Sequence, residues 1–468
     1  MTQLLSALPA SVVAEALPDL DTPGFSVSRR GLALGAAALF LPMRAFAQAP
    51  ADSAIVVDRA RTDPIPVAIT VFTGADGETQ RLGNDLATVI TNDLSRCGLF
   101  RAVDPAAFIG PVGDVPNFAN WKAIGAQALV TGRVESLGGG QVRVEFRLWD
   151  VLPGQQIQGT AFKGDLANWR RIAHLIADVV YERLLGEKGY FDTRVVYIGA
   201  TGPRDRRIKR LAIMDQDGEN NRFLTDGSWL VLSPRFHPTR DQIAFMSYAQ
   251  NRPRVYMFDL DTGRQSPLGD FKGITLSPRF APDGNSVVLS QTTENGNADI
   301  YTVELSSRKA HRLTDSGSID VSPCYSPDGT QIVFNSDRGG DQQLYIMGAD
   351  GSGAKRISFG NGKYATPVWS PRGDLIAFTR FGGNTFAIGV MRPDGSGERI
   401  LSESFYVEGP TFAPNGRVIM FWRETAARDA RGNGFSSRLV SIDITGFNER
   451  QVTTPTDASD PAWGPLLG

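Results

Sequence analysis

The residues best able to do chemistry in this 468-residue chain are three histidines and one short acidic segment. His174, His237 and His311 lie far apart in the sequence, and no pair of them has the spacing of metal ligands. The segment from Asp215 to Gly218 matches the opening of a calcium loop, but the glutamate required at the twelfth position is absent. Serine-nucleophile, phosphate-loop, zinc-protease and CxxC motifs are also missing. We therefore predict no catalytic residue, no cofactor and no metal site, and we expect all three histidines to be structural or exposed.

A five-residue phrase, proline-x-aromatic-x-proline, organises most of the chain. It occurs six times, at steps of 44, 45, 44, 43 and 51 residues. Each copy is followed by a turn and by further short β-rich runs, which makes four strands for each repeat. A period of roughly 40 to 45 residues built of short strands is typical of a β-propeller. The copies begin at Pro234, Pro278, Pro323, Pro367, Pro410 and Pro461.

The two ends of the repeat array predict how the ring closes. Residues 194–199, 208–215 and 222–226 have the pattern of the second, third and fourth strands of a blade that lacks its first strand. The last phrase, around Trp463, supplies a first strand that nothing follows. The fragments together form one composite sixth blade, which leaves no open sheet edge in a six-bladed propeller spanning residues 190–468.

A different pattern precedes the propeller. Residues 66–72 form an apolar strand, and residues 80–97 have an apolar helical face that ends at Gly98. Residues 141–149 alternate apolar and polar side chains, and Asp165 is placed to cap the start of a second long helix. Residues 65–189 are therefore predicted to form an α/β domain, a mixed sheet with helices.

The first 47 residues have the features of a targeting segment. Arg29 and Arg30 precede an apolar stretch at residues 31–42, and Ala45-Phe46-Ala47 is a small-x-small cleavage signature. The apolar stretch is shorter than the ~20 residues that span a bilayer, so we expect no membrane span in the mature chain. Sec and twin-arginine export both fit the sequence. Residues 48–64 would then be the N-terminal segment of an exported protein.

Composition narrows the function further. A formal net charge of -2 argues against a nucleic-acid partner. Cys97 and Cys324 are the only cysteines, and they fall in different predicted domains, so we expect two buried thiols and no disulfide.

The loops that lead into the inner strands, here called the lead-in loops, are the best candidates for function, because a propeller presents them at one mouth of its channel. They occupy residues 226–233, 273–277, 318–322, 363–366, 405–409 and 455–460. Apolar residues recur in them beside Asp, Ser and Glu, which is typical of a protein-binding surface, although the same residues could instead plug the channel. These apolar residues are Trp229, Val231, Ile274, Val321, Tyr364 and Tyr406.

An exported α/β domain followed by six blades with Ser-Pro-Asp-Gly turns resembles the TolB family of the bacterial Tol-Pal envelope system. The resemblance rests on the sixfold phrase, on the closing strand at Trp463 and on the segment Ile55-Val56-Val57-Asp58. It implies a periplasmic, non-catalytic and monomeric scaffold that maintains the outer membrane and its constriction during division. The family's propeller mouth receives Pal, an outer-membrane lipoprotein, and some bacteriocins imitate this contact. The N-terminal segment engages TolA of the inner membrane.

Carried over by position, the resemblance assigns TolA binding to Ile55, Val56, Val57 and Asp58, an extended segment suited to pairing with a partner's sheet edge. It assigns Pal binding to the lead-in loops. The residues that we assign to this contact are Val231, Ile274, Ser277, Val321, Ser322, Tyr364 and Tyr406. Two alternatives stay open: a propeller enzyme such as a sugar lyase, and a periplasmic propeller that binds a small ligand or a cation in its channel.

Overall fold

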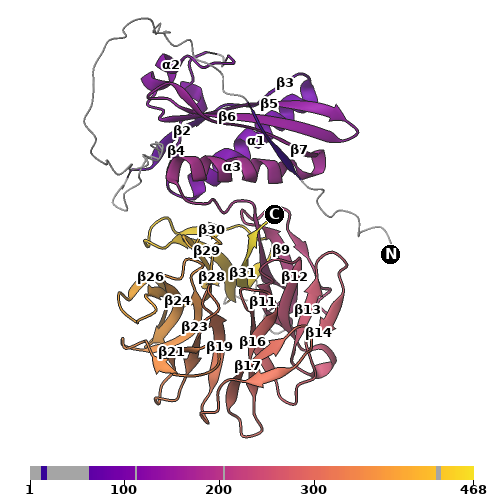
Figure 1. Cartoon of the computed structure of the whole chain (residues 1–468), viewed down its shortest axis with the longest axis vertical. Coiled ribbons are helices and arrows are strands. Elements are labelled where there is room, and N and C mark those ends of the chain that lie inside the picture. The colour runs from indigo at the N-terminus through magenta and orange to yellow at the C-terminus, as the bar shows by residue number, and fades with distance from the viewer. Residues whose placement is uncertain (1–11, 18–62, 111–112, 204–205, 428–433) are drawn as a thin grey trace, which may run out of the picture. The chain divides into compact units, whose positions relative to one another are not determined.

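The computed structural model describes residues 12–17, 63–110, 113–203, 206–427 and 434–468. The chain divides between Gly189 and Tyr190 into two compact units (Figure 1). The predicted cleavage site and the predicted TolA segment, Ile55 to Asp58, lie outside the described residues.

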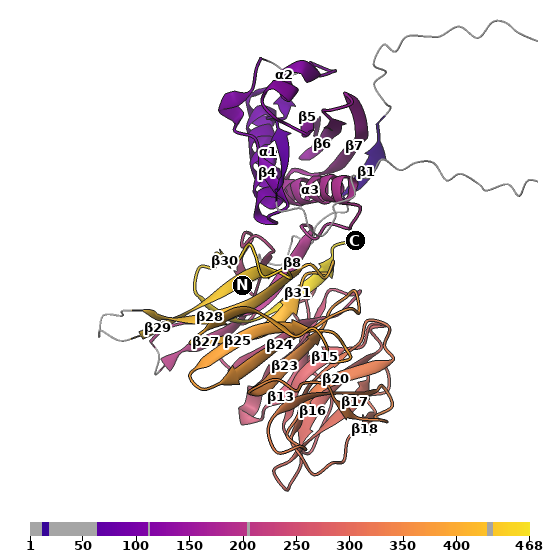
Figure 2. The ribbon, with the colours of Figure 1, turned by 90° about the vertical axis from the view of Figure 1, so that its left-hand side faces the viewer.

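The first unit is a mixed sheet with helices, as predicted. Its strands lie in the order β1-β7-β6-β5-β2-β4, with β3 paired to β5. Strand β2 is parallel to β4 and β5, and the β5-β6-β7 meander is antiparallel. Helices α1 and α3 contact each other and the sheet (Figure 2). The elements are β1 Val13–Ala16, β2 Ile65–Ile69, β3 Thr73–Gly74, α1 Gly77–Arg96, β4 Phe100–Ala102, η1 Pro105–Ala107, α2 Phe118–Ala123, β5 Ala128–Gly138, β6 Gln141–Asp150, β7 Gln155–Asp165, η2 Leu166–Asn168 and α3 Trp169–Leu185.

The predicted ends of the two long helices can be compared with the observed ones. Asp76 accepts hydrogen bonds from the backbone of Glu78 and Thr79 in a capping box, so α1 begins three residues before the predicted start. Gly98 follows its end with a φ of 78°, as predicted. The prediction for Asp165 was wrong. Its side chain accepts a hydrogen bond from Gln141 across the β6-β7 pair and makes no cap bond.

Strand β1 lies inside the segment predicted to be a leader. Val13 pairs with Lys163 and Ala16 with Thr160, so residues 13–16 extend the sheet at the β7 edge. Lys163 and Glu15 form an ion pair of 2.9 Å across this edge.

The second unit is a six-bladed propeller, and each blade is a four-stranded antiparallel sheet. Blades 1 to 5 follow one another along the chain, with the inner strand first. Blade 1 has β11 Val231–Phe236, β12 Gln242–Ser247, β13 Arg254–Asp259 and β14 Gln265–Pro267; blade 2 has β15 Thr275–Phe280, β16 Ser286–Thr292, β17 Ala298–Glu304 and β18 Ala310–Arg312; blade 3 has β19 Asp320–Tyr325, β20 Gln331–Ser336, β21 Gln343–Gly348 and β22 Lys355–Arg356. Blade 4 has β23 Lys363–Trp369, β24 Ile376–Gly382, β25 Thr385–Met391 and β26 Arg399–Ser404; blade 5 has β27 Tyr406–Phe412, β28 Val418–Ala427, β29 Gly434–Asp443 and β30 Arg450–Val452.

Blade 6 is composite, which confirms the predicted closure. Its inner strand is the C-terminal β31, Asp457–Leu466, and its other strands come from the start of the unit. Trp463 pairs with Val195, and its indole nitrogen donates to the Thr193 hydroxyl at 2.8 Å. The ring is therefore fastened by pairing between the two ends of the propeller sequence. The other strands of blade 6 are β8 Thr193–Thr201, β9 Ile208–Asp215 and β10 Arg222–Phe223.

A β-bulge interrupts all six inner strands at the same place. The residue before the first proline of each phrase has a positive φ, between 46° and 68°, and the strand register shifts there. Only one of the six is glycine, so the usual sequence signal of a positive φ is missing at five of the six bulges. These residues are Ser233, Ser277, Ser322, Thr366, Gly409 and Asp460.

The aromatic residues of the phrase pack between neighbouring blades, as predicted. Phe280 of blade 2 packs against a cluster that includes Ala244 and Val255 of blade 1. The Tyr325 hydroxyl of blade 3 lies 3.2 Å from the Thr302 hydroxyl of blade 2. These contacts join separate sheets into one continuous core.

His237 joins blades 1 and 2 through its imidazole ring. Nδ1 accepts hydrogen bonds from the backbone of Thr239 and Arg240 at 3.1 and 3.0 Å, and Nε2 donates to the Gly284 carbonyl at 2.9 Å. The side chain is buried and lies edge-on to Phe280. Two accepted bonds fix the neutral tautomer, and burial lowers the pKa of His237.

This geometry predicts an acid-sensitive contribution to stability. Because the unfolded histidine binds a proton more readily, the wild type should lose stability as the pH falls through about 6.5, by at most about 1.4 kcal/mol per pH unit. His237→Ser should reduce that loss. Denaturant unfolding at pH 7.5 and 5.5 measures the difference, and His311→Ser, which changes an exposed histidine, is the control. Equal pH dependence in wild type and His237→Ser would contradict the assignment.

Candidate partner-binding site

An exposed apolar side chain stands in the connection before each of the first five inner strands. The connections before all six inner strands lie at the same end of the ring, because the inner strands of a propeller run in one direction along the channel. The side chains are between 39% and 70% exposed, and each follows the outer strand of the preceding blade. Hydrophobic groups repeated in this way form an apolar rim around the mouth. The rim residues are Trp229, Ile274, Ile319, Phe359 and Phe405.

Hydrogen bonds hold the rim loops in place. The Ile274 backbone N–H donates to the Thr292 hydroxyl at 3.0 Å, and the Thr292 backbone N–H donates to the Ile274 carbonyl at 2.9 Å. The Ile319 backbone donates to the Asp337 carboxylate at 2.8 Å. The next residue, Asp320, is buried and bonded to Arg338 at 2.9 Å. The rim therefore presents its apolar groups from a fixed backbone, which reduces the entropy lost on binding.

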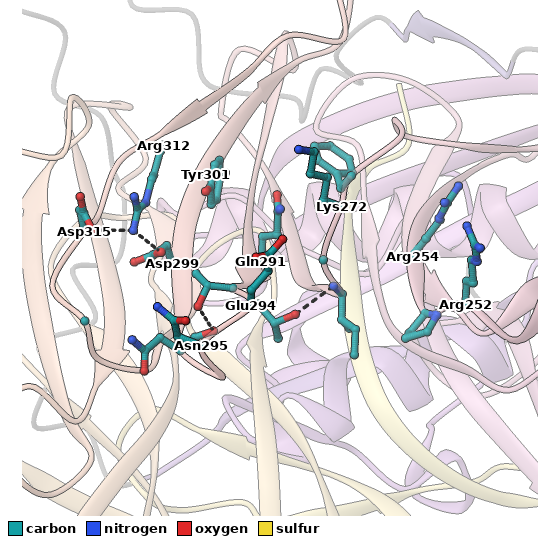
Figure 3. A pocket seen from close by; sticks show the side chains of 18 of the residues that line it. Arg252, Arg254, Lys272, Gln291, Glu294, Asn295, Asp299, Tyr301, Arg312 and Asp315 are labelled. Carbon is teal, nitrogen blue, oxygen red and sulfur yellow. Dashed lines mark hydrogen bonds and ion pairs between the residues drawn. The ribbon is translucent and has the colours of Figure 1, made fainter.

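A depression of about 950 Å³ adjoins Ile274 at this end of the ring, between the loops of blades 1 and 2 and the start of blade 3. Figure 3 shows Arg312 between Asp299 and Asp315 on one side of the depression. Arg252 and Arg254 lie on the other side. Arg312 lies 2.7 Å from Asp299 and 2.6 Å from Asp315. Despite the guanidinium, burial raises the pKa of Asp299.

The opposite wall carries positive charge. Arg254 is paired with the exposed Asp270 at 2.9 Å. Arg252 and Lys272 line the depression and form no ion pair with any of the described residues. The depression therefore offers a partner two cations without an ion-pair partner, and the carboxylate of Glu294 also lines it.

Several of the groups considered as candidates for chemistry make hydrogen bonds to neighbouring side chains. His174 is buried and hydrogen-bonded to Asp93 at 2.5 Å within the first unit. The Asp215 segment forms the β9-β10 turn, with Gly218 at a φ of 97° and the Asn220 amide donating to Asp215 at 2.6 Å. At the mouth, the Tyr406 hydroxyl donates to Glu408 at 2.6 Å, and burial raises the pKa of both groups.

Sequence comparison decides the family. The model of the TolB amino-terminal domain matches residues 53–157, and that of the TolB β-propeller domain matches residues 181–467. The Tol-Pal system protein TolB of Gluconobacter oxydans is 57% identical over 464 residues, which cover 97% of this chain and 99% of the relative. The homologue from Paramagnetospirillum magneticum is 55% identical and covers 94% and 98%.

The chain belongs to the TolB family.

The fold agrees with this assignment. The crystal structure of TolB from Acinetobacter baumannii superposes with a TM-score of 0.74 at 27% identity, covering 86% of this chain and 97% of that one. The TolB family consists of envelope components of the Tol-Pal system, so this chain is a Tol-Pal protein. Among the helices of the described residues, none has the length and hydropathy needed to cross a bilayer.

The Pal-type residues predicted from the TolB resemblance occupy different environments. Ile274 is exposed on the rim. Ser277, Val321, Ser322 and Tyr406 are half-buried beside the inner-strand bulges. Val231 and Tyr364 are buried, and the Tyr364 hydroxyl donates to Glu398, so both support the loops from below.

Sequence reasoning missed part of the TolB rim. Ile319 lies two residues before the predicted Val321 and is exposed, and Phe405 directly precedes the predicted Tyr406. Phe359 lies before the predicted fourth lead-in loop. A large apolar residue in a polar loop, just before an inner strand, was the available signal.

Proposed function

We propose that this chain is a non-catalytic periplasmic scaffold that binds a Pal-like outer-membrane lipoprotein at the propeller mouth and a TolA-like inner-membrane protein through residues 55–58. In this role it would link the two membranes, maintaining outer-membrane integrity and constriction at division. The observation that carries the proposal is the apolar rim: five successive blades each present one exposed apolar side chain at the same end. Family membership supports the choice of system.

The rim has the composition of a protein-binding surface. Aromatic side chains dominate the energetically important positions of interfaces, because they bury a large area with few rotatable bonds. Three of the five rim residues, Trp229, Phe359 and Phe405, are aromatic. Polar groups surround them, which fits a contact that forms and separates in water.

The positive charge of the depression suggests that the partner carries negative charge at this contact. Arg252 and Lys272 would face acidic side chains of the bound protein, beside the apolar contact at Ile274. Such pairs at an exposed edge accelerate association more than they raise affinity, and salt weakens the effect. We therefore assign the rim to affinity and the depression to orientation and association rate.

A capture experiment tests the assignment. The mature protein is used as bait with solubilised bacterial envelopes, and bound proteins are identified by mass spectrometry. Recovery of a peptidoglycan-associated lipoprotein and a TolA-like protein supports the proposal. Recovery of neither, with a soluble carbohydrate or peptide retained instead, would favour an enzyme or a ligand-binding propeller.

The two contacts are predicted to be coupled. In the family the order of the N-terminal segment reports Pal occupancy, so Pal should change the affinity for TolA. A coupling of about 1 to 3 kcal/mol corresponds to a change of roughly 5- to 150-fold. Titration of purified TolA domain into this protein, with and without saturating Pal, measures it. Equal affinities would remove the coupling and leave the two-site scaffold, whereas deletion of residues 55–58 should abolish TolA binding in both cases.

A further inference from the structure

The propeller encloses a second cavity, at the end of the channel opposite the apolar rim. All six inner strands contribute to its wall, and its volume is about 210 Å³. The rim loops precede the inner strands, whereas this cavity is lined by residues at their C-terminal ends, including Pro238 and Pro282. It is therefore separate from the proposed protein-binding mouth.

Two arginines face this cavity. Arg235 and Arg279 occupy the position after the first proline of the phrase in blades 1 and 2, on adjacent inner strands that contact each other. The four other repeats carry uncharged residues there. Positive charge is therefore concentrated on one side of the cavity. The uncharged equivalents are Cys324, Val368, Thr411 and Ala462.

The protein offsets the charge of the pair only in part, through the Asp460 carboxylate, which acts on Arg235 from outside the cavity lining. No aspartate or glutamate lines the cavity, and in the part of the chain that the structure describes neither arginine forms an ion pair. The Arg235 Nη1 group donates to the neighbouring Pro234 carbonyl at 2.6 Å, while its Nε is buried without a hydrogen-bond partner. Enclosed unpaired charge and unsatisfied donors are both costly, and a ligand that supplied negative oxygens would remove both costs.

The charge state supports this interpretation. Burial and the neighbouring Arg279 lower the pKa of Arg235 to about 9, and burial lowers the pKa of Arg279. Even so, both guanidiniums keep their protons at neutral pH. Both side chains are half-buried and line the cavity, so a small solute that enters it can reach them.

We propose that the cavity binds a small oxyanion, a carboxylate or a phosphate, between Arg235 and Arg279. The guanidinium fork matches the spacing of two oxygens in either group, and two such forks from adjacent strands can hold one anion. The aromatic walls, including Phe236 and Tyr325, leave room for a small apolar body attached to the anionic group. A cation is disfavoured in this cavity by the same two charges. The proposal is independent of the rim and of its partners.

Thermal unfolding with inorganic phosphate, sodium acetate or sodium chloride at matched ionic strength tests the site in the mature protein. Phosphate or acetate at about a hundredfold excess over its Kd should raise the Tm of the propeller by roughly 5 °C above the chloride value. The two anions distinguish a phosphate site from a carboxylate site. No rise above chloride with either anion would overturn the proposal.

Variants locate the effect. In the Arg235→Met/Arg279→Met double variant the Tm should no longer respond to the anion, and its Tm without anion should be no lower than that of wild type, because the unpaired charges are gone. Arg240→Met, an exposed arginine near the same end, should respond like wild type. If circular dichroism shows that the double variant is unfolded, Arg279→Lys serves instead, and calorimetric titration should show at least tenfold weaker binding. An unchanged response in either folded variant would refute the site.

Discussion

Replacing Trp463 with alanine is expected to destabilise the propeller by about 3 to 5 kcal/mol, the range for removing a buried tryptophan. Trp463 is 9% exposed and lies in the strand that closes the ring. Its indole bonds to Thr193 at 2.8 Å and lies edge-on to Tyr190 at 5.6 Å, while its backbone N–H donates to Thr411 of blade 5. The substitution therefore removes the indole contacts to Thr193 and Tyr190, while the backbone hydrogen bond to Thr411 can still form. Equilibrium unfolding in denaturant, followed by the intrinsic fluorescence of the remaining tryptophans, measures the loss.

The matched control is Trp229→Ala, which removes the same side chain from the rim. Trp229 is 44% exposed, so its removal should change the stability by no more than about 0.5 kcal/mol. Removing all of β31 by ending the chain at residue 456 should have a larger effect than Trp463→Ala, because β8 would become an open sheet edge. A Trp463→Ala protein as stable as the Trp229→Ala protein would show that closure does not depend on this strand.

The fold was predictable because the same interactions recur with the same spacing. Each phrase supplies an inner strand and an aromatic residue that packs against the preceding blade, so six copies agree on one architecture. Closure of the ring was predictable because the start of the repeat array lacked an inner strand and its end had an inner strand without the three that normally follow. The bulges were not, because Ser277, Thr366 and Asp460 stand where a positive φ would have suggested glycine. Their backbone conformation depends on how the inner strand pairs within the assembled blade. The sequence of a single repeat does not specify that pairing.

The sequence predicted which loops lie at one mouth of the propeller, but only some of the apolar side chains that are exposed there. The sequence placed the lead-in loops at one mouth, but the orientation of a side chain at a strand end changes with each residue. Val231 begins β11 and points inward, whereas Trp229 and Leu230 just before it are exposed. Arg235 and Arg279 were also overlooked, since a charged residue inside the repeated phrase has meaning only once the six inner strands surround a common cavity.

Charged or truncated rim residues are expected to weaken Pal binding strongly if the proposed docking surface is correct. Ile274→Glu places a carboxylate at the edge of the apolar rim and should cost about 2 to 4 kcal/mol, which is a roughly 30- to 900-fold rise in Kd. The fold should be preserved, because Ile274 bonds to Thr292 through its backbone. Calorimetric titration with the soluble domain of Pal measures the change.

Two matched phenylalanine variants distinguish the contribution of the rim to Pal binding from that of any exposed hydrophobic side chain. Phe359 and Phe447 are 70% and 77% exposed, but Phe359 belongs to the rim, while Phe447 lies in the β29-β30 turn at the other end of the ring. Phe359→Ala should weaken Pal binding by about tenfold or more, and Phe447→Ala should leave it unchanged. Both should unfold at the same denaturant concentration as wild type, since an exposed side chain contributes little to stability. If Phe447→Ala weakened binding and Phe359→Ala did not, Pal would have to dock at the opposite end, where the lead-in loops contribute nothing.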